Sequence, residues 1–457
     1  MAGKKFSRRQ VIAGTGGLAG LALTHPAVAA PRASRRVEAL LAKMSIEEKA
    51  GQLTCYFDTI RPDGQDSNPL TEMHDSRQLV EEVRAGRVGT LMSGLGVEGG
   101  KLAQTEAVEH SRLHIPLLFA ADVIHGLRTV FPIPLGEASA FDPDLAERTA
   151  RAAAKEATAY GLHWTFAPMV DVARDERWGR VAEGAGEDPY LGKVMAEARV
   201  RGFQGASLAD DDSLLATGKH FAAYGAVLAG LDYNTVDLSE ATLREVHLPP
   251  FKAAVDAGAL AIMTSFNDIN GVPSTANKRL LTGILRKEWG FKGVVISDCT
   301  ADAELVNHGV AADERDAARL AILAGVDISM QSGLYIKYLP ELVASGAVPI
   351  AVVDASVRRV LQLKETLGLF DRPYRSLDPA VQAKNTATPE MRALAREAAC
   401  KSIVLLKNEG GLLPLPKSGK RIALIGPFAE DRDNLSGPWA PFADNKLGVD
   451  LASGLRA

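Results

Sequence analysis

The chain has 457 residues, of which 46% are hydrophobic and 24% are charged, and these proportions are typical of a globular protein with a large core. With a formal net charge of -4, nothing argues for binding to nucleic acid or to an anionic membrane. The three cysteines, Cys55, Cys299 and Cys400, are too few and too scattered for a disulfide framework or a metal cluster, so we expect small buried side chains.

Residues 1–30 are predicted to be an export signal that lies outside the fold. Paired arginines, Arg8 and Arg9, precede a Gly/Ala-rich apolar run over 11–23, and residues 27–29 offer a small-residue cleavage site. The pattern resembles the bacterial twin-arginine signal, and the alternatives are an ordinary secretory signal or a basic tail. We therefore expect a periplasmic or secreted protein. No other apolar run approaches the roughly 18 residues of a membrane span.

The rest of the chain alternates between apolar runs and helical patterns. An amphipathic helix is predicted over 35–50, where Ser45 and Glu48 have the spacing of a capping box. Seven apolar runs that end in polar residues are predicted strands, at 88–93, 117–122, 163–171, 214–220, 260–267, 294–298 and 326–330. Helical patterns separate several of them, at 143–160, 239–257, 314–324 and 354–367.

This alternation predicts a parallel α/β fold, and we favour a barrel over an open sheet. A (β/α)8 TIM-like barrel over 31–370 needs an eighth strand, which we infer rather than identify. Residues 371–390 are polar and contain prolines, so we expect a linker. Residues 391–457 look like the beginning of a second α/β domain, with strands at 403–406 and 421–427. This segment is short for an independent α/β layer, so we expect the domain to be truncated.

Polar side chains stand where the predicted strands end. The strand at 294–298 contains three consecutive β-branched residues, which suits a strand buried on both faces. In parallel α/β folds the carboxyl edge of the sheet carries the chemistry. Any one of these residues could simply be a helix cap, but as a set they favour a shared pocket for a polyhydroxylated ligand. The set is Asp122, Asp171, Lys219, His220, Asn267 and Asp298.

Other chemistries find little support. The chain lacks an H-E-x-x-H helix and a cysteine pair, so the aspartates alone would have to form a metal site. The stretch 94–101 lacks phosphate-loop spacing, and Leu102 stands where Ser or Thr is required. A serine nucleophile would need a G-x-S-x-G turn, which is missing. We therefore expect neither a metal nor a cofactor.

Several blocks together resemble glycoside hydrolase family 3, in particular its bacterial periplasmic β-glucosidases. The likeness runs from about residue 36 to the C-terminus, and any one block alone would be weak evidence. The blocks are ADVIHG at 121–126, APMVD at 167–171, RWGR at 177–180, KHFAAYG at 219–225, WGFKG at 289–293 and SD at 297–298.

The resemblance implies a role for each matching residue. Asp298 corresponds to the nucleophile that forms a covalent glycosyl-enzyme with retention of configuration. Asp122 corresponds to the acid that holds the outer hydroxyls of a terminal β-D-glucosyl residue. Arg180, Lys219 and His220 correspond to residues that grip the ring hydroxyls, and the Lys219–His220 pair is a cis or strained feature in such enzymes. The second domain would be an α/β sandwich, and the substrate a small-molecule or oligosaccharide β-glucoside.

For some residues a structural role remains open. Arg180 could simply pair with Glu183 or Asp188 on a surface loop. Trp178 is expected to be a packing residue, and Asp171 is expected to anchor a loop rather than to bind substrate.

The chain also departs from the family pattern. Phe266 stands where many relatives carry Tyr, so a hydroxyl that could donate to the nucleophile is absent, although Phe266 is still expected to contact substrate. Cys299 stands where relatives often carry Trp.

No acid/base residue can be identified, because two-domain relatives take it from the second domain. The His-containing loop of single-domain relatives is absent from 219–225. The alternatives to an active β-glucosidase are a truncated sugar-binding remnant and a fragment that needs its missing C-terminal part. The sequence indicates neither linkage preference nor oligomeric state.

Overall fold

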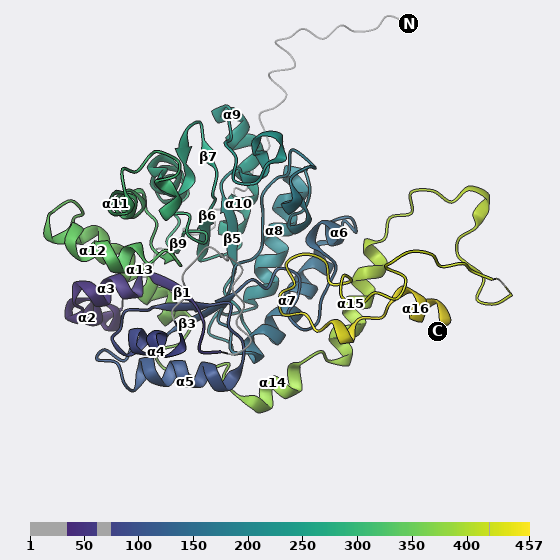
Figure 1. Ribbon diagram of the computed structural model, residues 1–457, viewed down its shortest axis with the longest axis horizontal. Helices are drawn as coiled ribbons and strands as arrows, with labels where there is room; N and C mark the ends of the chain where they lie inside the picture. Colours follow the sequence, from purple (N-terminus) through teal and green to yellow (C-terminus); the bar gives the residue numbers. More distant parts are fainter. Residues whose placement is uncertain (1–33, 62–74, 420) are drawn as a thin grey trace, which may run out of the picture. The chain divides into compact units, whose positions relative to one another are not determined.

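The structure, a computed structural model, describes residues 34–61, 75–419 and 421–457. The predicted export signal lies outside these residues, and the fold described below belongs to the unit Ala33–Ala457. Figure 1 shows strands at the centre of this unit with helices around them.

The described chain begins with two helices where we expected one. Helix α2 (Arg35–Lys43) is followed by Met44, whose backbone is extended, and α3 (Ile46–Gln52) begins after Ser45. The Ser45 hydroxyl accepts from the backbone N–H of Glu48, and the Glu48 carboxylate accepts from the backbone N–H of Ser45 at 2.8 Å. The prediction of a single helix over 35–50 is therefore wrong, because this capping box starts a new helix in its middle.

Among the described residues, eight parallel strands form the centre of the fold. One five-stranded sheet has the order β10-β1-β2-β3-β4, and a second sheet has the order β5-β6-β9. Parallel bridges between Trp164 and Leu215 and between Ile296 and Ile328 join the two sheets at both edges, so the strand pairs run around a ring. The strands are β1 (Thr54–Phe57), β2 (Thr90–Met92), β3 (Leu118–Ala121), β4 (Trp164–Thr165), β5 (Thr217–Phe221), β6 (Ala261–Thr264), β9 (Val294–Ile296) and β10 (Ser329–Met330).

All seven strands that we predicted within residues 31–370 are present, although most are shorter than expected. The eighth, β1, follows directly on α3 and was not predicted. Residues 268–273 add a small antiparallel hairpin of β7 (Asp268–Ile269) and β8 (Val272–Pro273).

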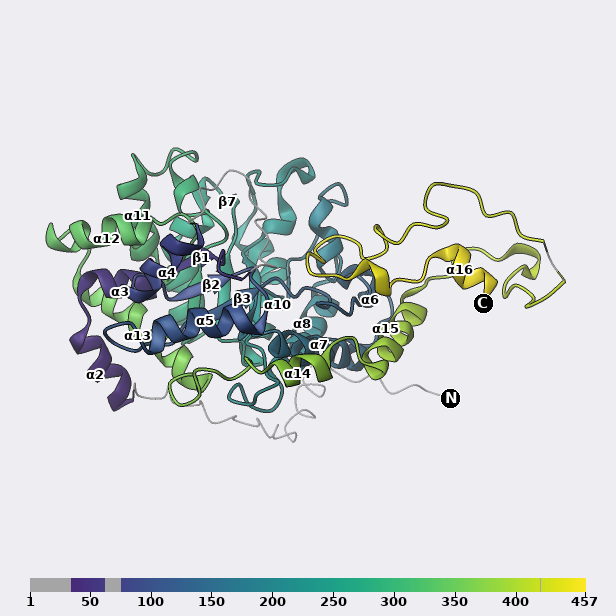
Figure 2. The same ribbon diagram turned by 60° about the horizontal axis from the view of Figure 1, so that its bottom comes forward.

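Helices surround the ring, as Figures 1 and 2 show. The longer ones are α4 (Ser76–Arg84), α5 (Val97–Val108), α7 (Pro143–Ala159), α8 (Pro189–Gln204), α10 (Pro249–Asp256), α11 (Glu314–Ala324), α12 (Leu334–Ala344) and α13 (Ile350–Thr366). The helix predicted over 239–257 is divided into α9 (Glu240–Thr242), a π-helical turn η4 (Leu243–His247) and α10, because Pro249 and Pro250 cannot donate to the preceding turn. In the described residues no helix is long and apolar enough to cross a bilayer.

The core lies inside the ring and between the ring and its helices. Val294, Val295 and Ile296 are completely buried, as the run of β-branched residues predicted. Burying one such side chain contributes about 1.5–3 kcal/mol, so this short strand is firmly held. Cys55 is buried as expected, but Cys299 is only half-buried and Cys400 is exposed.

The expected linker contains a helix, α14 (Pro379–Asn385), and is followed by α15 (Pro389–Ser402). Both helices pack against α7, and Figure 2 shows them along it. The buried carboxylate of Glu156 on α7 accepts from the backbone N–H groups of Arg128, Thr129 and Ala387 at 2.8–3.0 Å. The linker is therefore held through Ala387 to helix α7, which lies outside the ring of strands.

The strands expected at 403–406 and 421–427 do not form in the described residues. Each would need a neighbouring strand to satisfy its backbone groups, and the apolar side chains Ile403 and Leu406 are 77% and 91% exposed instead. The described part of 403–457 consists of loops, the short turns η8 (Glu409–Gly411) and η9 (Asn445–Leu447), and helix α16 (Leu451–Arg456).

Candidate active site

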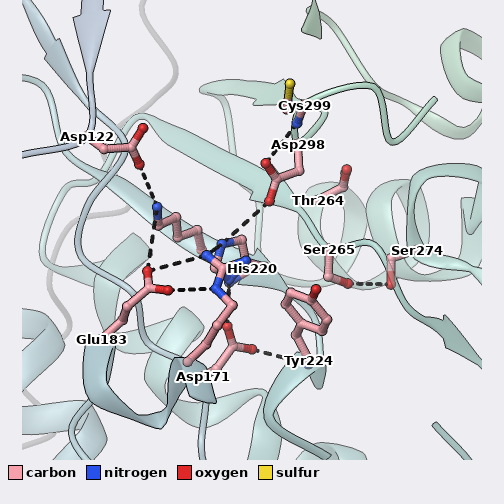
Figure 3. Close-up of polar contacts among 12 residues, drawn as sticks. Asp122, Asp171, Glu183, His220, Tyr224, Thr264, Ser265, Ser274, Asp298 and Cys299 are labelled. Carbon is pink, nitrogen blue, oxygen red and sulfur yellow. Dashed lines mark hydrogen bonds and ion pairs between the residues drawn. The ribbon is translucent and has the colours of Figure 1, made fainter. Parts of the chain in front are cut away.

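The predicted site residues meet at the carboxyl edge of the ring. Asp122 directly follows β3, Lys219 and His220 lie in the last part of β5, and Asp298 comes two residues after β9. Because all eight strands are parallel, these strand ends lie on one side of the sheet. Figure 3 shows the carboxylate of Asp298 directed toward His220.

Lys219 connects two acidic side chains. Its ammonium nitrogen lies 2.8 Å from Asp122 Oδ1 and 4.0 Å from Glu183 Oε2. Lys219 is buried, whereas Asp122 remains partly exposed. A buried ammonium is costly unless it is paired, so Asp122 compensates Lys219 and still presents oxygen to the open site.

His220 is held on both ring nitrogens. Nδ1 lies 2.9 Å from Asp171 Oδ2 and donates to it, because Nε2 accepts from Arg180 and a neutral imidazole carries one N–H. Nε2 lies 2.7 Å from Arg180 Nη2, which can only donate, so Nε2 is the accepting nitrogen of a neutral ring. Burial lowers the pKa of His220, and the positive charges of Arg180 and Lys219 lower it further, which keeps the ring neutral.

Asp171 anchors the end of β5. Besides the His220 ring, it accepts from the backbone N–H of His220 at 2.8 Å and from that of Tyr224 at 3.2 Å. Its side chain is fully buried and forms these bonds within the protein, which agrees with the expected anchoring role. The Lys219–His220 peptide bond is cis, as the family resemblance implied.

Arg180 belongs to the site and also forms the pair with Glu183 that we considered as an alternative. Its Nε lies 2.6 Å from Glu183 Oε1, and both residues belong to the turn η1 (Gly179–Glu183). Glu183 is buried and adds a carboxylate that we had not counted as a site residue. The spacing of three residues between Arg and Glu was the available signal.

Asp298 faces His220 across the site. Oδ2 lies 3.5 Å from His220 Nε2, and Oδ1 accepts from the backbone N–H of Cys299 at 2.7 Å. Burial raises the pKa of Asp298 to about 6, against the positive charges of Arg180 and Lys219. With a pKa of about 6 the carboxyl group is mostly ionised at neutral pH, and because its side chain is 14% exposed it is accessible to a ligand.

Aromatic residues line the side of the site next to β6. Phe266 is buried, with its ring centroid 4.5 Å from that of Tyr233 and 5.9 Å from that of Tyr224. Trp178 is buried and donates from Nε1 to Asp232 Oδ1 at 2.8 Å, in keeping with its expected packing role.

Trp439 is a further aromatic residue at the site that the sequence analysis missed. Its ring centroid lies 5.6 Å from the Arg180 guanidinium and 5.4 Å from the Lys219 ammonium. The neighbouring carbonyl oxygens of Pro438 and Phe442 lie 2.8 Å from His125 Nε2 and 3.1 Å from Arg128 Nη1. An aromatic wall therefore comes from the segment after the linker, although Cys299 does not supply one.

Among the described residues there is no group of three or more His, Cys, Asp or Glu side chains suited to a metal ion. The described site combines carboxyl groups, an imidazole, a lysine, an arginine and aromatic rings. Such a set can accept from and donate to several hydroxyl groups while a ring face packs on an aromatic side chain.

The chain belongs to glycosyl hydrolase family 3. Residues 45–363 match the family's N-terminal domain, and residues 403–457 match its C-terminal domain. The second match shows that both domains of the family are represented and gives no support to the expectation that the second domain is truncated.

Named relatives include several glycosidases. The chain is 44% identical to a periplasmic beta-glucosidase of Salmonella typhimurium over 91% of this chain and 53% of the relative. It is 38% identical to a putative beta-xylosidase of Formosa agariphila, covering 87% and 54% of the two chains, and 33% identical to a lysosomal beta glucosidase of Dictyostelium discoideum, covering 92% and 55%. The chain thus spans about half the length of these curated relatives.

Solved structures give the same result. A beta-glucosidase from Listeria innocua in complex with isofagomine has a TM-score of 0.86 and 41% identity, over 92% of this chain and 58% of that one. An exo-1,3/1,4-beta-glucanase from Pseudoalteromonas has a TM-score of 0.80 and 30% identity, over 92% and 54%.

Proposed function

We propose that this protein is a β-glucosidase that releases terminal non-reducing β-D-glucosyl residues with retention of configuration. The observation that carries the proposal is the Asp298 carboxylate, ionised and accessible, 3.5 Å from His220 Nε2 at the strand edge that also holds Asp122 and Lys219. The names of the Salmonella and Listeria relatives support glucose as the sugar.

In this proposal Asp298 is the nucleophile. One oxygen of Asp298 attacks the anomeric carbon while the bond to the leaving oxygen breaks, and water later hydrolyses the glycosyl-aspartate. Asp122 accepts from the outer sugar hydroxyls. Arg180, Lys219 and His220 bind the hydroxyls near the reacting carbon, and Phe266 contributes an apolar wall.

The proposed retaining mechanism also needs a carboxylic acid about 5–5.5 Å from the nucleophile to protonate the leaving oxygen. We assign no residue of this chain to that role. Leaving groups that depart without protonation should therefore react best, and we expect an aryl glucoside to be hydrolysed faster than cellobiose. Equal rates on the two substrates would contradict this expectation.

We further propose that the ring of eight strands is a TIM-like barrel over residues 31–370, followed by a linker at 371–390 and the start of the α/β-sandwich domain at 391–457. Residues 1–30 would direct export through the twin-arginine route to the periplasm or the exterior. The Salmonella relative, a periplasmic protein by name, supports this location.

A mechanism-based probe tests the proposed function. Dinitrophenyl 2-deoxy-2-fluoro-β-glucoside carries a leaving group that needs no acid, so glycosylation requires only the nucleophile and the sugar-binding residues. We expect the full chain to release dinitrophenolate in a burst and to carry the fluoroglucosyl mass on the peptide that contains Asp298. The Asp298→Ala variant should bind glucose and show no burst. Labelling elsewhere, or an equal burst in the variant, would refute the assignment, and faster labelling by the matching xyloside would refute glucose as the preferred sugar.

A further inference from the structure

Phe266 contributes a ring without a hydroxyl group to the site, at a position where the family resemblance implies a tyrosine in many relatives. The strand register places Phe266 close to Asp298, because Met263 of β6 pairs with Ile296 of β9. Two residues further along the parallel strands, Ser265 stands level with Asp298, and Phe266 comes next. The Phe266 carbonyl oxygen lies 3.1 Å from His308 Nε2, so the loop that follows Asp298 also packs against this residue.

A tyrosine from another loop covers the Phe266 ring. The ring of Tyr233 lies 4.5 Å from that of Phe266, and the ring of Tyr224 is 6.4 Å from Tyr233. Tyr233 is 52% exposed, so its ring lies at the open side of the site rather than in the core. The Tyr233 phenol thus packs against Phe266 and stays accessible from solvent.

Three contacts hold the Tyr233 loop against the strand ends. The Thr235 hydroxyl donates to Asp268 Oδ1 at 2.7 Å, and the backbone N–H of Val236 donates to the carbonyl oxygen of Asp268 at 3.0 Å. On the other side, Asp232 accepts from Trp178. Tyr233 itself has a φ of 65°, a backbone conformation that is costly for a bulky residue and is found mostly where function requires it.

The pKa of the Tyr233 hydroxyl is affected by the proposed nucleophile, Asp298. Burial raises the pKa of Tyr233 to about 12, with the Asp298 and Glu304 carboxylates as the next causes. A nearby carboxylate has this effect because it favours the protonated phenol, which is the hydrogen-bond donor. The phenol therefore keeps its proton throughout the working pH range of a glycosidase.

We propose that Tyr233 is a positioning residue for Asp298, and that its hydroxyl takes the place of the tyrosine hydroxyl missing at Phe266. When the sugar is bound, the phenol donates to the Asp298 carboxylate, keeps it ionised and holds it for attack. Hydrogen bonds of this kind are often long in unliganded sites and shorten in the complex. This inference rests on the proposed function, since it assigns a partner to the proposed nucleophile.

The pH dependence of Asp298 depends on every charged group that faces it. A donor to the ionised carboxylate lowers its pKa, and its removal raises that pKa. Arg180, Lys219 and the Cys299 N–H lower the pKa of Asp298, and Asp122 raises it. Further titratable groups near it are His220, whose pKa is lowered by burial, Glu304, whose pKa is raised to about 7 by burial and then by Asp298, and Tyr224, whose pKa is raised mainly by burial.

The test compares Tyr233→Phe with wild type by the rate of labelling with dinitrophenyl 2-deoxy-2-fluoro-β-glucoside between pH 4.5 and 8. In this step the Asp298–anomeric carbon bond forms, and dinitrophenolate leaves with the electron pair. The loss of one hydrogen bond to a charged group should slow labelling at the optimum by about tenfold to a hundredfold. The acidic limb of the profile should move up by about one pH unit, since the donor had stabilised the ionised form.

Two further variants sharpen the test. Tyr338→Phe is the matched control, because the Tyr338 hydroxyl also donates to a carboxylate, Glu314 Oε2 at 2.8 Å, but on the outer helices α11 and α12. It should label like wild type. The double variant Tyr233→Phe with Phe266→Tyr moves the hydroxyl from one packed ring to the other and should recover most of the lost rate.

The possible outcomes separate this inference from the proposed function. Labelling of wild type at Asp298 with an unchanged acidic limb in Tyr233→Phe would overturn the role of Tyr233 and leave the proposed function standing. The role of Tyr233 would also be overturned if Tyr233→Phe labelled more slowly, but with the acidic limb of wild type, and the added Phe266→Tyr change did not restore the labelling rate. If wild type is not labelled at Asp298, the proposed function fails, and the inference fails with it.

Discussion

Replacing Lys219 by methionine probes the charge balance of the site most directly. The change keeps the length and the apolar part of the side chain but removes the ammonium group, which lies 2.8 Å from Asp122 Oδ1. Asp122 then loses its partner, and the site loses the ammonium group that we propose as a donor to a sugar hydroxyl. The positive charge of Lys219 also lowers the pKa of Asp298, so the variant should need a higher pH to ionise the proposed nucleophile.

The expected magnitude follows from the burial of the pair. Truncating one partner of a buried, hydrogen-bonded charge pair costs about 2–5 kcal/mol. Asp122 keeps some exposure to solvent, so we take the lower part of this range, about 2–4 kcal/mol. At about 1.4 kcal/mol for each factor of ten, kcat/KM for an aryl β-glucoside should fall by roughly 30-fold to 1,000-fold.

The assay measures initial rates of aryl β-glucoside hydrolysis between pH 5 and 8, with thermal unfolding of each variant as a check on folding. Lys252→Met is the matched control, because Lys252 pairs with Asp256 one helical turn away on the exposed face of α10. A surface pair of this kind contributes about 0.3–0.5 kcal/mol, so this variant should keep at least half of the activity. If Lys219→Met loses less than fivefold, or no more than Lys252→Met, our account of the pair is wrong.

Two other predictions concern stability and export. Lys364 is buried, donates to Gln52 Oε1 at 2.6 Å and to the Gly89 carbonyl oxygen at 3.0 Å, and burial lowers its pKa to about 7. Because the unfolded chain binds this proton up to about pH 10, the free energy of unfolding should rise between pH 7 and 10, by at most about 4 kcal/mol from this group. Thermal unfolding should show a smaller rise in Lys364→Met, and parallel curves for the two proteins would contradict this. Replacing Arg8 and Arg9 together by lysine should keep the chain in the cytoplasm, and cell fractionation that still finds it outside would exclude the twin-arginine route.

The strands of the ring could be predicted from the sequence wherever an apolar run ends in polar residues. The run Val294–Ile296 is clear because three β-branched residues stand together. Strand β1 (Thr54–Phe57) was missed because it follows α3 after a single residue, without glycine or proline to separate the two elements. Its pairing with β2 and β10 depends on contacts that are far apart along the chain.

In the candidate site, too, the sequence does not reveal contacts between residues that are far apart along the chain. Residues at strand ends were found, because parallel strands bring their carboxyl ends together whatever the loops do. Tyr233 and Trp439 come from loops, where no periodic pattern indicates direction or partner. The strands expected at 403–406 and 421–427 show the opposite error, since their composition favours a strand but the described residues provide no neighbour for pairing.

The loop after β3 holds both ends of the segment that follows the ring. Through the backbone of Arg128 and Thr129 it shares the Glu156 carboxylate with the linker residue Ala387, and through His125 it holds the carbonyl oxygen of Pro438. The same loop begins with Asp122. The residues that contact the C-terminal segment and the carboxylate of Asp122 therefore lie on one short stretch of chain, so a substitution that changes the placement of that segment should also change the position of Asp122.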